Sequence, residues 1–88
     1  MRNEMHFVTV DDIQILTTRR VAFTISIERH RHLTDPGVVE RSMNAFMTAY
    51  TRVEKWEASA SGGTLYIVVT GDFDMDVAHE WIRKVRNG

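Results

Sequence analysis

Alternation of apolar and polar residues is clearest from Val21 to about Glu28, where every second side chain is a large apolar one. A period of two built from β-branched and aromatic residues is typical of a half-buried strand. A second strand is predicted from Thr64 to Thr70, but there the residues on both faces are fairly apolar. That composition favours a central strand, or a strand whose second face is covered by something else.

Steps of three and four residues between apolar side chains predict a long helix after Thr34-Asp35-Pro36. Thr34 or Asp35 can cap its first amides, and proline is tolerated in a first turn because its missing N–H has no partner there. We expect this helix to end near Ala58. The apolar stripe consists of Val39, Met43, Phe46, Tyr50 and Val53. Another stripe, acidic early and basic late, predicts a last helix that begins near Asp74 or Asp76.

The N-terminal third of the chain admits two interpretations. Alternation of residue types favours two short strands, over residues 5–10 and 13–17, with a turn leading into the strand at Val21. The alternative places a helix over residues 10–20, with Thr9 and Asp12 forming a capping box.

Taken together, these elements predict one α+β domain over residues 1–88, in the order β-β-β-α-β-α. Residues 21–28, the long helix and residues 64–70 form a β-α-β unit, so these two strands should be parallel and their crossover right-handed. The predicted architecture is a two-layer sandwich, in which a four-stranded mixed sheet carries two helices on one face. The other face of the sheet is left open.

Composition agrees with a small globular domain. The 88 residues are 43% hydrophobic and 26% charged, which excludes a disordered chain. There is no cysteine, so neither a disulfide nor a thiolate metal site can stabilise the fold, and a chain this short is expected to be only marginally stable unless a partner covers more of it. No apolar run approaches a membrane span and no signal peptide is visible, so we expect a cytoplasmic protein without membrane contact.

Charge is balanced overall but uneven along the chain. A formal net charge of −1 argues against a histone-like nucleic-acid binder and against an acidic nucleic-acid mimic. Between residues 19 and 32, however, the chain contains four arginines and only one acidic residue, Glu28. These arginines are Arg19, Arg20, Arg29 and Arg31. They leave nucleic-acid binding open as an alternative function, with phosphate contacts from both ends of the predicted strand.

Catalytic chemistry has little support in the sequence. If the strand continued past Glu28, then Glu28, His30 and His32 would point to one side, where they could ligate zinc or nickel, although solvated residues at a strand end are the simpler interpretation. No serine sits in a Gly-x-Ser-x-Gly turn, and Gly62-Gly63 lacks the lysine of a phosphate loop. A small metal-dependent or acid/base enzyme using His6, Glu28 or His79 remains an alternative, and no cofactor is expected.

The strand at Thr64–Thr70 suggests an interface. With Leu65, Ile67 and Val69 turned toward the helices, the residues between them must face the open side of the sheet. That open side is predicted to hold Tyr66 and Val68 beside Thr24 and Ser26. We therefore predict a non-enzymatic protein-binding module, a homodimeric adaptor or inhibitor of a larger partner, that docks through this face or through an edge strand.

Overall fold

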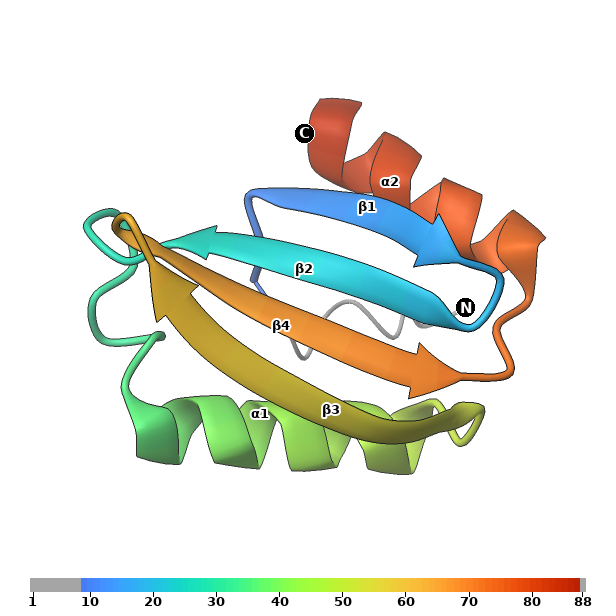
Figure 1. Cartoon of the computed structure of the whole chain (residues 1–88), viewed down its shortest axis with the longest axis horizontal. Helices are drawn as coiled ribbons and strands as arrows, with labels where there is room; N and C mark the ends of the chain where they lie inside the picture. The colour runs from blue at the N-terminus through green and yellow to red at the C-terminus, as the bar shows by residue number, and fades with distance from the viewer. Residues whose placement is uncertain (1–8, 88) are drawn as a thin grey trace.

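The computed structural model describes residues 9–87, which form four strands and two helices (Figure 1). The elements in chain order are β1 (Asp12–Thr17), β2 (Arg20–Ser26), α1 (Pro36–Ala49), β3 (Val53–Ser61), β4 (Thr64–Gly71) and α2 (Met75–Asn87). The α+β class, the four-stranded sheet and the two helices on one face are confirmed.

The strands form one sheet in the order β1-β2-β4-β3, and every neighbouring pair is antiparallel. Helix α1 carries the chain from β2 across to the far edge, where β3 begins, and a tight turn then returns β4 into the gap beside β2 (Figure 1). That turn is Gly62-Gly63, and both glycines have positive φ, at 59° and 80°. Two-residue hairpins need such φ values because they match the twist of the flanking strands.

The expected mixed sheet is therefore corrected to an antiparallel one, because α1 is shorter than predicted. It ends at Ala49 instead of near Ala58, and residues 53–61 form β3. Val53 and Trp56 fit a helical stripe, but as a helix the remaining residues of this segment would offer almost nothing apolar to the core. As a strand they pair with β4 along its whole length. The pair predicted to be parallel, β2 and β4, is consequently antiparallel.

The N-terminal third is settled only in part. Residues 13–17 are a strand, within β1, so the alternative helix over residues 10–20 is wrong. Most of the predicted strand at residues 5–10 lies outside the described residues, and its last two residues are not in a strand.

Aromatic side chains hold both helices against the same face of the sheet. Phe23 of β2 meets Phe46 of α1 edge-on at 5.6 Å between ring centroids, and Phe46 meets Trp81 of α2 at 5.7 Å. Trp81 also contacts Phe23 at 6.3 Å and Tyr50 at 5.1 Å. These four rings are at most 8% exposed, so most of the apolar surface that the domain buries lies between the sheet and the two helices.

Both helices begin where the sequence predicts. Asp35 caps α1, since its carboxylate accepts a hydrogen bond from the Gly37 N–H at 3.2 Å, and Pro36 occupies the first turn. The carboxylate of Asp74 accepts from the Asp76 N–H at 2.9 Å just before α2. Neither helix of the described chain has the length and apolarity that crossing a lipid bilayer requires.

Candidate functional site

In the described part of the chain, the face of the sheet opposite α1 and α2 carries no helix, and it lies toward the viewer in Figure 1. The strand register brings together the residues predicted for a docking surface. Thr24 pairs directly with Tyr66, and Ser26 pairs with Thr64. Val68 pairs with Ala22 one step along the same face. We call this surface the open face; its centre consists of Ala22, Thr24, Ser26, Thr64, Tyr66, Val68 and Thr70.

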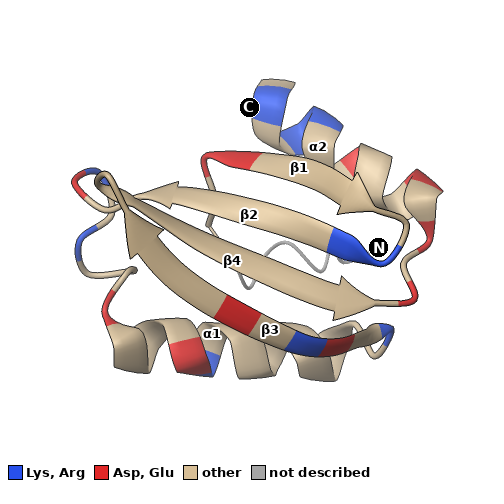
Figure 2. Ribbon diagram, viewed as in Figure 1, with Lys and Arg blue, Asp and Glu red and all other residues tan. Residues whose placement is uncertain are grey.

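The centre of the open face is uncharged. β4 has no charged residue and β2 has only Arg20, at one end (Figure 2). Tyr66 is the one large apolar residue of this centre that stands clear of the surface, with 39% of it exposed. Charged side chains lie at the margins instead, with Lys55 and Glu57 on the flanking β3, 3.9 Å apart. An uncharged centre inside a polar rim is the usual anatomy of a protein interface.

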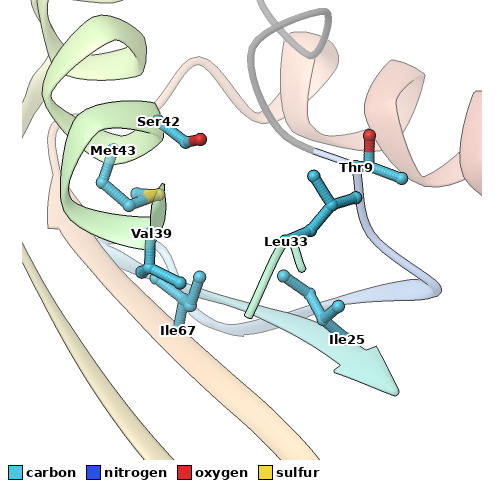
Figure 3. A pocket seen from close by; sticks show the side chains of 7 residues that line it. All are labelled: Thr9, Ile25, Leu33, Val39, Ser42, Met43 and Ile67. Carbon is cyan, nitrogen blue, oxygen red and sulfur yellow. The ribbon is translucent and has the colours of Figure 1, made fainter. Parts of the chain in front are cut away.

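The cavity shown in Figure 3 is on the other side of the sheet, between β2, β4 and α1. Its lining is mostly aliphatic, and its two polar groups are the hydroxyls of Thr9 and Ser42. The volume is about 50 Å³, which is room for a few water molecules only. Without a titratable side chain, this cavity offers no general acid or base for a reaction.

Of the arginines in the predicted basic patch, two are already paired with acidic residues. Arg19 donates to the carboxylate of Glu54 at 2.8 Å, and Arg29 lies 3.1 Å from that of Asp11. Arg19 and Arg20 lie before or at the start of β2, whereas Arg29 and Arg31 follow its end. The two pairs are thus separated by the length of the strand, and half of their positive charge is neutralised locally.

The predicted metal-ligating residues do not share one side of a strand. β2 ends at Ser26, and the chain then turns, with the His30 N–H donating to the Ser26 carbonyl at 3.1 Å. The strand therefore does not continue through Glu28, His30 and His32, and the condition on which the metal hypothesis depended is not met. Among residues 9–87, no three or more histidine or acidic side chains are grouped so that they could hold a metal ion.

Asp11 is a structural residue that the sequence interpretation did not single out. Its carboxylate accepts a 2.6 Å hydrogen bond from the Ser26 N–H, and it also faces Arg29 and His30. The pKa of Asp11 is lowered, chiefly by the Ser26 hydrogen bond and further by Arg29 and His30, against the opposing effect of burial. This carboxylate ends β2 and fixes the turn that leads toward α1.

The outer edge of β3 is a second surface that the sequence interpretation missed, because a helix was expected there. A groove runs between the start of α1 and the last part of β3. Apart from Trp56, the residues of β3 that line this groove have small side chains. Its lining residues are Thr34, Pro36, Val39, Glu40, Trp56, Ala58, Ser59, Ala60 and Leu65. Residues Ala58 to Ser61 are all exposed.

Comparisons with protein-family models, with curated proteins and with solved structures find no match for this chain. The open face and the outer edge of β3 are the two surfaces of the described chain that could bind a partner.

Proposed function

We propose that this chain is a non-enzymatic, cytoplasmic protein-binding module, a homodimeric adaptor or inhibitor of a larger partner, and that the open face is its docking surface. The observation that carries the proposal is the charge-free centre of that face, with the half-exposed ring of Tyr66 beside Thr24 and Val68. Tyrosine is among the residues that contribute most to binding energy, while lysine and glutamate are depleted from interface centres.

The chemistry of the face supports a protein partner better than a small ligand. Small-molecule sites are concave, whereas this surface is an uninterrupted set of paired strands with short side chains. The molecule measures 31 × 26 × 26 Å, so one broad side spans roughly 800 Å², about what each partner contributes to a standard interface. A partner would thus have to cover nearly the whole face.

Site-specific photocrosslinking in the native host tests the proposal. A benzophenone amino acid replaces Tyr66 in one variant and Asn44, an exposed residue of α1 on the helix side, in a matched control. We expect illumination to give one dominant protein adduct from position 66 and none from position 44, with mass spectrometry identifying the captured protein. Tyr66→Lys should abolish copurification of that same protein.

Two results would overturn the proposal. One is the absence of any adduct from position 66; the other is the same adducts from both positions, which would mark random collision. An adduct of position 66 with a second copy of this chain would place the homodimer contact on the open face.

A further inference from the structure

The backbone hydrogen bonds establish which groups along β3 are free. Gly71 N–H donates to the Arg19 carbonyl at 2.9 Å and Ile27 N–H donates to the Gly63 carbonyl at 3.0 Å, one at each end of the β2–β4 pair. Hydrogen-bonded residues alternate in an antiparallel ladder, so the odd-numbered residues of β4 turn their backbone groups to β2. The even-numbered ones turn to β3, where they meet Lys55, Glu57, Ser59 and Ser61.

The residues between those partners therefore direct their N–H and C=O groups away from the sheet. They are Trp56, Ala58 and Ala60. Edge strands are normally protected from pairing by charges, proline or irregular register. β3 has such protection only in its first half, with Glu54, Lys55, Glu57 and a register shift between Val53 and Lys55. From Ala58 to Ser61 the strand is regular, uncharged and exposed.

The opposite edge of the sheet is protected. β1 has six residues against nine in β3, and its register shifts between Ile15 and Thr17. Arg86 from α2 reaches over this edge, donating to the carboxylate of Asp12 at 3.0 Å and to the Ile13 carbonyl at 3.4 Å. One edge of the sheet is thus short, irregular and partly covered by Arg86, whereas the other offers a row of backbone groups that have no partner among residues 9–87.

We infer that β3 pairs edge to edge with β3 of a second copy of this chain, antiparallel, about a two-fold axis at Ala58. In this register Ala58 lies opposite itself, and Trp56 lies opposite Ala60 of the second copy. All three free residues of each copy then form both of their backbone hydrogen bonds, about six across the interface by the antiparallel rule. The inference rests on the homodimer of the proposed function, but it gives the dimer contact a surface separate from the open face.

Charge and register favour this arrangement over symmetric axes at Glu57 and at Trp56. An axis at Glu57 would set that carboxylate against itself, which is destabilising for directly opposed like charges. An axis at Trp56 would pair Ala58 with Glu54, within the register shift, and would leave Ala60 beyond the end of the other strand. With the axis at Ala58, Glu57 faces the uncharged Ser59 of the second copy.

The groove beside α1 supports a second copy over an unrelated peptide. Exposed alanines at positions 58 and 60 leave space between the strand and the helix start at Pro36. The partly buried indole of Trp56 in the second copy would lie next to Ala60, so a large side chain meets a small one on each side of the axis. The two open faces would join into one face of an eight-stranded sheet, with roughly twice the docking area.

Sedimentation velocity tests the inference with three forms of the protein. The wild type should sediment as a dimer at tens of micromolar, and Ala58→Pro as a monomer. Proline removes an N–H that has no partner among the described residues, so circular dichroism of this variant should match the wild type. Tyr66→Lys, on the open face, should still be a dimer.

Cysteine crosslinking tests the register independently, because the chain has no native cysteine. Oxidised Ala58→Cys should form a disulfide-linked dimer, since opposed residues have Cα atoms about 5.5 Å apart, within reach of a disulfide. Ala60→Cys is the matched control: its two copies would be four residues out of register, and no crosslink is expected.

The inference is overturned if the wild type is a monomer at high micromolar concentration, if Ala58→Pro remains dimeric, or if the two cysteine variants crosslink equally. A monomeric Tyr66→Lys would also overturn it and would assign the dimer contact to the open face. These results are distinguishable from failure of the proposed function, which is read from crosslinking at position 66 in the host.

Discussion

The carboxylate of Asp11 binds the backbone at the point where β2 ends. The sequence pattern extends the strand to about Glu28, and Ile27 continues the apolar alternation. In the structure, however, the carboxylate of Asp11 accepts a hydrogen bond from the Ser26 N–H at 2.6 Å and also contacts Arg29 and His30. These contacts hold the turn that follows Ser26. The hydroxyl of Ser26 accepts in turn from the Arg29 N–H at 3.3 Å. The same turn separates Glu28, His30 and His32, which is why the postulated metal set does not form.

Asp11→Asn should lower the free energy of unfolding by about 1 kcal/mol at pH 7, because it removes a charge-assisted hydrogen bond and the ion pair with Arg29. The folded-state pKa of Asp11 lies below the ordinary value of 3.8, so its stabilisation is complete above that value and is lost as the pH falls through the folded-state pKa. The difference between wild type and variant should therefore shrink below about pH 4, as measured by urea unfolding at several pH values.

Glu28→Gln is the matched control for Asp11→Asn, because it removes an exposed carboxylate from the same turn. Its effect should stay within about 0.5 kcal/mol. Equal effects of the two substitutions, or an Asp11 effect that does not change with pH, would contradict the assigned role.

Among the secondary-structure elements, β3 is the one that the local sequence pattern predicted wrongly, as part of a helix. Val53 and Trp56 satisfy a helical stripe as well as a strand, so the periodicity of residues 50–58 does not discriminate between the two. Two features favour the strand. Gly62 and Gly63 form a hairpin turn, and β4 would have no partner on its second edge if residues 53–61 were helical. Helix α1 retains the part of the stripe that meets the core, at Val39, Met43 and Phe46.

Gly71 is needed where β4 meets the start of β3. A Cβ at this position would run into the backbone carbonyl of Arg52 and the Cα of Val53, neither of which can move without disturbing the pairing. Gly71→Ala should therefore destabilise the fold by about 1–3 kcal/mol. Thermal and urea unfolding of the purified variant measure this.

Gly37→Ala, at the start of α1, is the control, since there a Cβ would meet only the side chains of Asp35 and Arg41. This substitution should leave stability unchanged or raise it by up to about 1 kcal/mol. A Gly71→Ala protein as stable as the wild type would show that the two strands are less closely apposed than described.

For the whole molecule, the helices cover one face of the sheet and leave two surfaces unused, the open face and the outer edge of β3. A chain of 88 residues has little surplus stability, so covering either surface should have a measurable effect. Two of the four arginines between residues 19 and 32, Arg19 and Arg29, form ion pairs with Glu54 and Asp11.

If two copies pair through β3, the melting temperature of the wild type should rise with protein concentration, because association stabilises the folded state by mass action. Calorimetry between about 5 and 500 μM measures this shift. Ala58→Pro should show no such dependence, whereas Tyr66→Lys should retain it. A concentration-independent melting temperature for the wild type would argue against the dimer.

The residue pattern was enough to predict the α+β class, the strands β2 and β4, the start of each helix, and the faces on which Tyr66, Val68, Thr24 and Ser26 lie. Each of these follows from local periodicity or capping, which a residue's immediate neighbours specify. Only the three-dimensional structure shows that residues 53–61 are a strand, that the sheet is antiparallel, and that the outer edge of β3 has no partner strand among residues 9–87. Those outcomes depend on hydrogen bonds between segments distant in sequence, and no local pattern contains them.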